Sequence, residues 1–292
     1  MTIQSIDNLV AAITAGKSTR YDWNKITGAA AYALGGWFDL SMLGAMPVAN
    51  AWAGTALNWR ACDETTGNGT QIFGMPHGGN VSPLKKHLLN MNAWGTAATA
   101  VPGTLMLIDM QGYYPGITNN SLSAQTMVGT PSPRYTNGEG LRAFMVQTAA
   151  AGATAQNFNM SYTDQAGNAG NTLPVTVACT ASSIAGRVNH SGVAANNYGP
   201  FLPLDNGDTG IRSVQTVTMS AANTGTFALV LARPLASITL SVAGLMTEKD
   251  LLNQIPSLPE IKDGACLTWL WGAGAATAAS TTFAGGIEAV WG

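Results

Sequence analysis

Residues 156–163 read Gln-Asn-Phe-Asn-Met-Ser-Tyr-Thr, an alternation of polar and apolar side chains. The large side chains fall on one face of an extended chain, because successive strand residues point to opposite sides. They are Phe158, Met160 and Tyr162. The next segment, Asp164–Gly170, is rich in residues that favour turns, and Leu173–Cys179 reads as another strand. This stretch therefore predicts antiparallel β-structure.

The same chemistry recurs along the chain. Apolar or alternating runs bounded by turn residues predict further strands. They cover Gly103–Met110, Arg142–Thr148, Val214–Ser220, Thr226–Ala232, Ala265–Trp271 and Ile287–Trp291, and Trp37–Leu40 reads as a short strand or a turn. The Gly-bearing segment 221–225 predicts a hairpin that joins 214–220 to 226–232. Gly112–Gly116 predicts a turn, and residues 118–140 predict a loop.

The N-terminal segment has a helical pattern instead. Residues 4–16 carry aliphatic side chains at helical spacing, with Ser5 as the N-cap and Gly16 as the stop. The polar stretch Lys17–Lys25 follows. We interpret residues 1–25 as an N-terminal helical arm. It either docks on its own body or reaches a neighbouring subunit.

Two further segments have helix signals. Residues 82–92 place Pro83 in the favoured first turn and several side chains on one face. These side chains are Leu84, His87, Leu88 and Met91. Residues 247–255 predict a short helix, capped by Thr247 and ended by Pro256.

Together these elements define the fold class. The sequence predicts a mainly β protein, with an antiparallel β-sandwich or barrel-like body over residues 26–292 and a few short helices. No fixed-period repeat and no Pro/Ser-rich linker divides this body. It forms either one β domain or two β subdomains, and the sequence indicates no boundary between them.

The composition is unusually poor in charge. Charged residues make up 10% of the chain, against about 25% in a typical soluble domain. Such a surface tends to associate, so we expect much of it to contact other protein. The alternative is a neutral exterior rich in hydroxyl and amide groups. The net charge is −2 and Lys85-Lys86 is the only adjacent basic pair, so the sequence does not predict direct nucleic-acid binding.

Cysteines and terminal segments bear on the compartment. Cys62, Cys179 and Cys266 are odd in number and far apart, which predicts small buried side chains and no required disulfide. The N-terminus lacks the basic and apolar regions of a secretory signal. No apolar run approaches the ~20 residues that span a bilayer, so no membrane association is expected. Synthesis in a cytoplasm without export is the simplest expectation.

No catalytic constellation is evident. His77, His87 and His190 lack zinc-ligand spacing, and the nucleophile and phosphate-binding motifs are missing. The adjacent pair Asp63-Glu64 reads as a solvated loop, since acid–base work needs carboxylates placed across a substrate. We therefore predict no catalytic, cofactor-binding or metal-binding residues. Asp205–Gly210 reads as a turn, with calcium binding as the alternative because the loop is rich in oxygen ligands.

Tryptophans are the most conspicuous aromatic residues. We expect core and subunit-interface roles for the majority of them. They include Trp37, Trp52, Trp59, Trp269, Trp271 and Trp291. An exposed aromatic shelf near Tyr113-Tyr114 or Trp94 would instead indicate glycan binding.

Two segments carry a resemblance to a known group of proteins. One is Pro-Arg-Tyr-Thr-Asn-Gly-Glu-Gly at 133–140, followed by the strand and turn that end at Gly167. The other is Gly-Pro-Phe-Leu-Pro-Leu-Asp-Asn-Gly-Asp-Thr-Gly-Ile-Arg-Ser-Val at 199–214, continuing to Leu235. Together they resemble virion structural proteins encoded in many tailed-bacteriophage genomes. The resemblance covers about half of the chain and contains no catalytic motif.

The resemblance implies a non-enzymatic component of a phage particle that decorates or cements the capsid. Its partners would be the major capsid protein or other virion proteins, and it would act as a homo-oligomer in the virion. A trimer is favoured, because closed symmetry hides strand edges. The alternative function is a host-glycan-binding module on the tail or surface. An enzyme ranks last, because only 15 acidic residues are present and none are evidently paired.

Overall fold

The computed structural model describes residues 3–28, 30–96, 101–131, 134–192, 199–254 and 258–292. These residues form a mainly β protein of three antiparallel sheets, as the strand patterns predicted. The helical elements are α1 (Ile6–Thr14), η1 (Leu40–Met42), η3 (Thr136–Gly138) and α2 (Leu251–Gln254).

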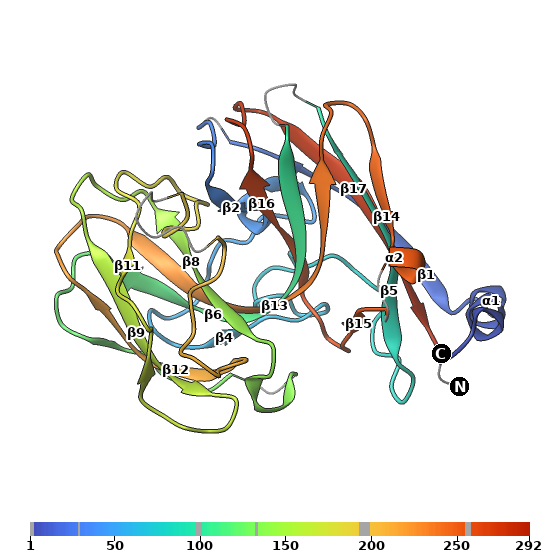
Figure 1. Cartoon of the computed structure of the whole chain (residues 1–292), viewed down its shortest axis with the longest axis horizontal. Helices are drawn as coiled ribbons and strands as arrows, with labels where there is room; N and C mark the ends of the chain where they lie inside the picture. The colour runs from blue at the N-terminus through green and yellow to red at the C-terminus, as the bar shows by residue number, and fades with distance from the viewer. Residues whose placement is uncertain (1–2, 29, 97–100, 132–133, 193–198, 255–257) are drawn as a thin grey trace.

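The first sheet lies nearest the chain termini (Figure 1). Its strand order is β14 (Thr247–Asp250), β5 (Lys86–Gly95), β17 (Thr282–Trp291), β1 (Ser18–Ile26) and β3 (Gly44–Met46), with β15 (Glu260–Ile261) also paired to β5. The C-terminal strand β17 is therefore central, and the N-terminal strand β1 lies beside it.

The other two sheets share no strand with the first. The second has the order β2 (Trp37–Asp39), β16 (Leu267–Ala273), β6 (Gly103–Thr118), β13 (Thr226–Leu240) and β8 (Arg142–Ala149), with β4 (Arg60–Ala61) paired to β6. The third has the order β10 (Asn171–Thr172), β9 (Asn157–Asp164), β12 (Ile211–Met219) and β7 (Gln125–Thr126), with β11 (Val177–Ala178) paired to β9.

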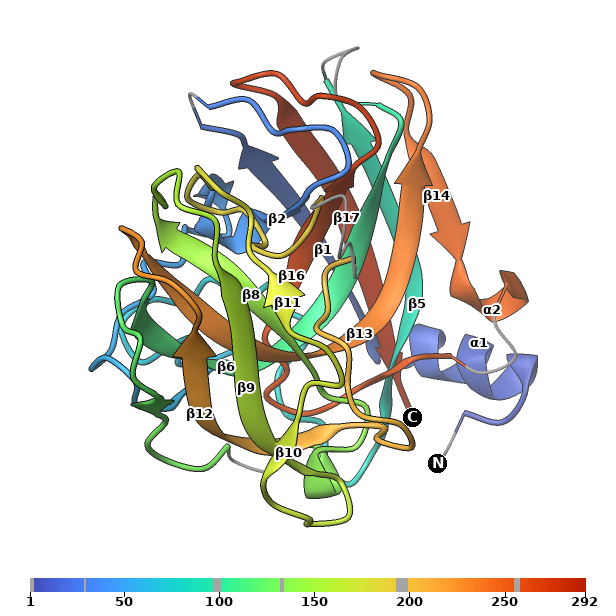
Figure 2. The same cartoon turned by 60° about the vertical axis from the view of Figure 1, so that its left-hand side comes forward.

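Two long strands connect the two halves of the molecule. β6 and β13 pair from Gly103 opposite Leu240 to Thr118 opposite Thr226, and register shifts bend them along the way. One end of this pair faces the first sheet and the other end faces the third (Figures 1 and 2). The second sheet thus serves as one layer in two successive β-sandwiches.

Each sandwich has its own apolar core. The first core buries side chains of the first sheet against one end of the second: Leu88, Met91, Phe283 and Ile287 with Leu105, Leu107, Trp269 and Trp271. The second core buries the third sheet against the other end: Phe158, Met160, Tyr162 and Val217 with Tyr114, Met145, Phe227 and Leu229. The period-two pattern of residues 156–163 is confirmed, since its three large side chains all lie in this core.

Helix α1 follows its sequence signals. The Ser5 hydroxyl accepts a hydrogen bond from the Asn8 main-chain N–H at 3.2 Å. Gly16 adopts a left-handed conformation just beyond the helix, where glycine is favoured. The segment 1–25 is therefore helical only in its first part, over Ile6–Thr14. Its second part belongs to strand β1, Ser18–Ile26, which pairs with both β17 and β3 in the first sheet.

The predicted helix over 82–92 is wrong. Lys86–Gly95 forms strand β5, which pairs with β17 on one side and with β14 and β15 on the other. Leu88 and Met91 are both buried in a strand because an extra residue, Leu89, bulges between them. Tertiary pairing on both sides overrides the local helical spacing.

The predicted hairpin of 214–220 with 226–232 is also wrong, although both strands exist. β12 pairs with β9 and β7, whereas β13 pairs with β6 and β8. The segment 221–225 therefore crosses from the third sheet to the second. Each strand buries its apolar face in a different layer of the second sandwich, which a flat hairpin cannot do.

Three further local predictions need correction. The turn at Gly112–Gly116 lies inside β6, where strand pairing continues. The strand over 173–179 is reduced to Val177–Ala178. Thr247 starts a strand rather than a helix, and α2 begins only at Leu251. The predicted stop at Pro256 lies outside the described residues.

Candidate functional site

A group of ionisable side chains is largely buried where the long strand β6 bends. We call Glu64, His77, Lys86, Asp109 and Arg134 the buried polar cluster. Asp109 and His77 are fully buried, and Lys86 and Glu64 are nearly so. Burying charge is unfavourable unless each group is paired, so the contacts of this cluster decide what it does.

Asp109, in the middle of β6, is the acceptor for three residues from two different segments. Arg134 donates to both of its carboxylate oxygens, at 2.7 and 2.9 Å. The Tyr135 hydroxyl donates at 2.7 Å and the main-chain N–H of Cys266 at 2.9 Å. Burial, followed by the Asp109 charge, raises the pKa of Tyr135. Tyr135 is therefore a fixed hydrogen-bond donor at neutral pH.

Arg134 connects further loops. Its guanidinium donates to the carbonyl oxygens of Cys62 at 3.0 Å, Gly264 at 2.8 Å and Met110 at 3.1 Å. A planar guanidinium with several fixed donors suits this kind of multiple contact. Arg134 and Asp109 thus tie three loops to strand β6.

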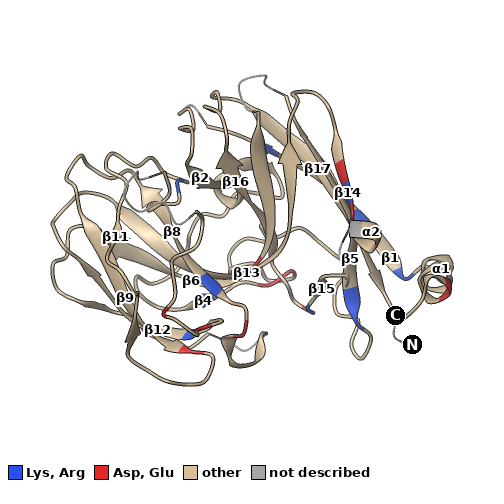
Figure 3. Ribbon diagram, in the orientation of Figure 1, with Lys and Arg blue, Asp and Glu red and all other residues tan. Residues whose placement is uncertain are grey.

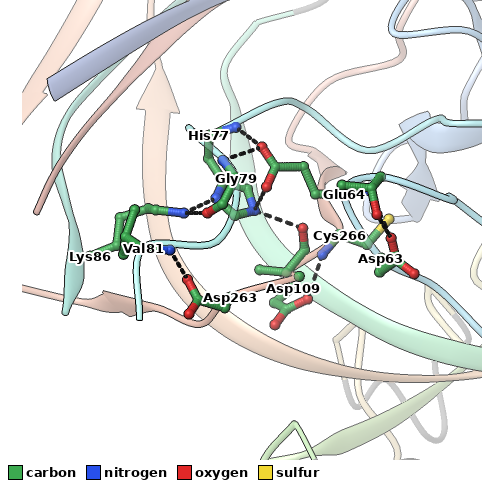
Figure 4. Close-up of polar contacts among 12 residues, drawn as sticks. Asp63, Glu64, His77, Gly79, Val81, Lys86, Asp109, Asp263 and Cys266 are labelled. Atoms are coloured by element: carbon green, nitrogen blue, oxygen red, sulfur yellow. Dashed lines mark hydrogen bonds and ion pairs between the residues drawn. The ribbon is translucent and has the colours of Figure 1, made fainter. Parts of the chain in front are cut away.

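The remaining cluster members form a second chain of contacts (Figure 4). Lys86 Nζ lies 2.8 Å from His77 Nδ1 and also donates to the Gly79 carbonyl. Since an ammonium only donates, Nδ1 is the acceptor and the His77 proton sits on Nε2. Nε2 lies 2.9 Å from the Ala265 carbonyl oxygen and 3.3 Å from a Glu64 oxygen. Burial, and then the Lys86 charge, lower the pKa of His77, so its ring is neutral at neutral pH.

Glu64 completes this chain by holding the loop that carries His77. Its Oε1 accepts from the main-chain N–H of His77 at 2.6 Å and of Gly79 at 3.1 Å. Asp263 acts similarly, accepting from the N–H groups of Val81 and Ser82 at 2.9 and 3.1 Å. These carboxylates position main-chain segments.

A cleft of about 540 Å³ opens beside the buried polar cluster. Charges of both signs line it: Asp63, Lys85, Lys86, Arg134, Glu260, Lys262 and Asp263. Asp63 accepts from the main-chain N–H groups of Thr65 and Thr66, both at 2.7 Å, and Glu260 pairs with Lys262 at 2.8 Å. The lining carboxylates are thus engaged with neighbouring protein groups.

The residues singled out from the sequence are scattered. His77 belongs to the buried polar cluster, whereas His87 lies on strand β5 and not on a helix. His190, expected in a polar loop, is fully buried, and burial lowers its pKa to about 4. Of the pair Asp63-Glu64, only Glu64 is buried, so a wholly solvated loop was the wrong interpretation.

The three cysteines are buried free thiols, as their spacing indicated. In the loop Asp205–Gly210, the Tyr162 hydroxyl donates to Asp208 at 2.6 Å and accepts from the Asp205 N–H at 2.8 Å. These contacts fasten the loop to strand β9. Within the described ranges, no three His, Cys, Asp or Glu side chains gather closely enough to hold a metal ion.

The aromatic residues have mainly core positions. Tyr113 and Tyr114 are fully buried, so they do not form the exposed shelf that the alternative of glycan binding requires. Trp94 on β5 is partly exposed. Of the six tryptophans expected in the core or at interfaces, Trp52, Trp269 and Trp271 are buried. Trp37, Trp59 and Trp291 are partly exposed.

Sequence reasoning missed the centre of the buried polar cluster. In the sequence, Asp109 lies within the apolar run Gly103–Met110 that predicts a strand, and Arg134 lies within the segment 133–140 that resembles phage virion proteins. A carboxylate inside an apolar run is itself a signal, because such a group is rarely buried unpaired. Its partner Arg134 lies 25 residues away, a separation for which no local pattern exists.

The molecule also exposes apolar side chains, most clearly on helix α1. Leu9 and Ala12 pack on Val290 of β17. Ile6, Val10 and Ile13 point away from the body and are 67%, 55% and 40% exposed. Their spacing places them along one face of the helix. The helix therefore has side chains for both roles expected from the sequence. One face, with Leu9 and Ala12, docks on the body, and the face with Ile6, Val10 and Ile13 is exposed and available to a neighbouring subunit.

Charged residues are sparse along the ribbon in both halves of the molecule (Figure 3). No described helix combines the length and apolar character needed to cross a membrane.

Comparisons of the sequence with known protein families and with curated proteins identify no relative: no family model and no curated protein matches it. Alignments to solved structures include the VP2 subviral particle of infectious bursal disease virus, at 8% identity over 94% of this chain and 80% of that chain, with a TM-score of 0.19. The Gt strain of that virus aligns at 9% identity over 94% and 79%, with a TM-score of 0.21. At such TM-scores the likeness carries no argument.

Proposed function

We propose that this protein is a non-enzymatic structural component of a phage particle that decorates or cements the capsid. The observation that carries the proposal is the exposed aliphatic face of helix α1, on a protein with 10% charged residues. Exposed apolar surface is unfavourable in water by roughly 25 cal/mol per Å², and a partner that covers it removes this cost.

The buried polar cluster supports the non-enzymatic part of the proposal. Its side chains form hydrogen bonds with main-chain groups and with one another. His77, which has the chemistry of a base, is fully buried and is not among the residues that line the cleft. A general base must reach the proton that it removes, whereas the His77 ring is held between Lys86 and the Ala265 carbonyl oxygen.

The partners that fit this role are the major capsid protein or other virion proteins, and further copies of this chain. The chain would be made in the host cytoplasm and reside in the virion. A closed ring such as a trimer would cover exposed side chains on each copy.

Quantitative mass spectrometry of purified particles of the virus that encodes the chain tests this proposal. A structural component is present in a fixed ratio to the major capsid protein, at many copies per particle. Particles that contain no copies, or a few copies in variable amount, would overturn it.

A further inference from the structure

Strand β1 has an open side along its first half. β17 pairs with all of Ser18–Ile26, whereas β3 pairs on the opposite side only with Asn24–Ile26. Among the described residues, no other strand pairs with Ser18–Trp23 on that side. An unpaired strand edge offers main-chain donors and acceptors to another strand.

The register with β17 shows which main-chain groups face the open side. The Trp291 N–H donates to the Lys17 carbonyl at 3.0 Å, and the Thr27 N–H donates to the Thr281 carbonyl at 2.9 Å. The pairing between these two points is continuous, so odd-numbered residues of β1 bond to β17. The main-chain groups of Ser18, Arg20 and Asp22 therefore point to the open side.

The side chains along this edge carry opposite charges. Arg20 and Asp22 lie on the same face of β1, with Arg20 Nε 3.0 Å from Asp22 Oδ1. Their side chains are 57% and 73% exposed. Both are therefore available to a strand that approaches this edge.

We propose that β1 pairs antiparallel with β1 of a second copy of this chain, about a two-fold axis that passes beside Tyr21. Arg20 then lies opposite Asp22 of the partner subunit, and Asp22 lies opposite the partner's Arg20. The main-chain groups of these residues, which face the open side, form the hydrogen-bonded pairs. The two first sheets become one continuous sheet, an isologous contact in which both copies use the same surface.

Charge selects this register over its neighbours. Main-chain hydrogen bonding requires an even-numbered residue of one copy to lie opposite an even-numbered residue of the other. The two-fold axis therefore always passes beside a residue of β1, and the alternative registers place it beside Arg20 or beside Asp22. An axis at Arg20 would set Arg20 against the partner's Arg20, and an axis at Asp22 would set two carboxylates together. Like charges directly opposite each other are destabilising, whereas opposite charges are stabilising.

The extent of β3 is compatible with the same register. β3 occupies the side of β1 from Asn24 onward. Pairing about Tyr21 uses Thr19–Trp23, which lie wholly within the open stretch Ser18–Trp23. The contact does not depend on the proposed role in a particle, and it can join single copies or closed rings.

A cysteine at the two-fold axis tests the register. Tyr21 would face the partner's Tyr21 in a non-hydrogen-bonded pair, where Cα atoms lie about 4.5 Å apart. That separation is within the range of a disulfide, roughly 4.4–6.8 Å. Under mild oxidation, Tyr21→Cys should give a covalent dimer. The native cysteines are buried and should not interfere.

Thr19→Cys is the matched control. It lies on the same face of β1, two residues away, but its copy in the partner would be about 13 Å distant, four residues along the strand. It should stay monomeric on non-reducing gels. Equal cross-linking of both variants, or none with Tyr21→Cys in protein whose circular dichroism shows a native fold, would overturn the proposal.

Charge reversal gives an independent readout. Asp22→Arg sets cations against cations across the axis and should raise the dimer dissociation constant about tenfold in sedimentation experiments. The double variant Arg20→Asp/Asp22→Arg restores opposite pairs and should return it toward the wild-type value. A double variant as weak as Asp22→Arg would contradict this register.

Discussion

Asp109 and Arg134 meet at two points inside the protein, with Nη2 2.7 Å from Oδ1 and Nε 2.9 Å from Oδ2. Breaking a buried ion pair leaves its other member uncompensated, which costs about 3–5 kcal/mol. We expect Asp109→Ala to lower the free energy of unfolding by that amount. Denaturant unfolding of the wild type and the variant measures it.

A partly exposed pair provides the control. Glu260 and Lys262 lie 2.8 Å apart near the cleft, and such pairs contribute about 0–1 kcal/mol. Lys262→Met should therefore change the free energy of unfolding far less than Asp109→Ala. If both variants lose a similar amount of unfolding free energy, the Asp109–Arg134 pair does not stabilise the fold more than an exposed ion pair does.

His190 should make the protein sensitive to acid. Burial lowers its pKa to about 4, below the ordinary value of about 6.5. Between these values the unfolded chain binds a proton that the folded protein does not, so stability falls as pH drops from 6.5 toward 4. Between pH 7 and pH 4.5 this residue accounts for a loss of about 2 kcal/mol.

The measurement compares wild type with His190→Gln at both pH values. Asp39 acts in the opposite direction, because burial raises the pKa of its carboxyl to about 6 and its contribution falls as pH rises. Both proteins contain Asp39, so its contribution cancels when the stability change of the variant is subtracted from that of the wild type. An equal loss of stability in wild type and variant on acidification would exclude His190 as the source.

The exposed face of α1 should govern attachment to the capsid. A triple variant in which Ile6, Val10 and Ile13 are each changed to Ser removes the exposed aliphatic side chains. It leaves the docked side chains Leu9 and Ala12 in place. We expect at least a tenfold loss of affinity for empty shells in co-sedimentation, with an unchanged melting temperature to within a few degrees.

The matched control for this triple variant changes exposed aliphatic side chains elsewhere. Leu34, Leu122 and Leu245 are 66%, 60% and 60% exposed and lie outside α1. Their triple Ser variant should bind shells as the wild type does. If it loses as much affinity as the α1 variant, general surface hydrophobicity, and not the helix, drives attachment.

The crossing between the third and second sheets depends on a glycine. Gly225 has a positive φ of 93°, and a Cβ there would lie 2.5 Å from the Ala150 carbonyl oxygen. Gly225→Ala should therefore cost roughly 1–3 kcal/mol through strain and main-chain displacement. Gly244→Ala, at φ 71° with open space around it, should cost less. Equal losses would mean that the close approach at Gly225 is unimportant.

Local pattern was sufficient for several of the strands and insufficient for their partners. The alternation at Phe158, Met160 and Tyr162 predicted a strand with one buried face, and the structure has it. By contrast, β12 and β13 are separated by a short turn-like segment and yet belong to different sheets. Nothing in those two strands encodes that choice, since it depends on which distant layers cover each apolar face.

The helix predicted over 82–92 failed for a related reason. Its spacing of apolar side chains arose from a bulge at Leu89, which shifts the strand's alternation by one residue. A bulge and a helical turn produce similar short patterns, and only pairing with β17 separates them. The buried polar cluster was hidden in the same way, because Asp109 and Arg134 meet through tertiary structure alone.

The account rests on binding of this chain to a capsid, and light scattering of the purified full-length protein, with and without assembled empty shells of its own virus, measures that most directly. We predict a closed oligomer of defined mass that binds the shells and saturates at a fixed number of copies. A protein whose mass is unchanged by shells, and which leaves their mass unchanged, would contradict the account.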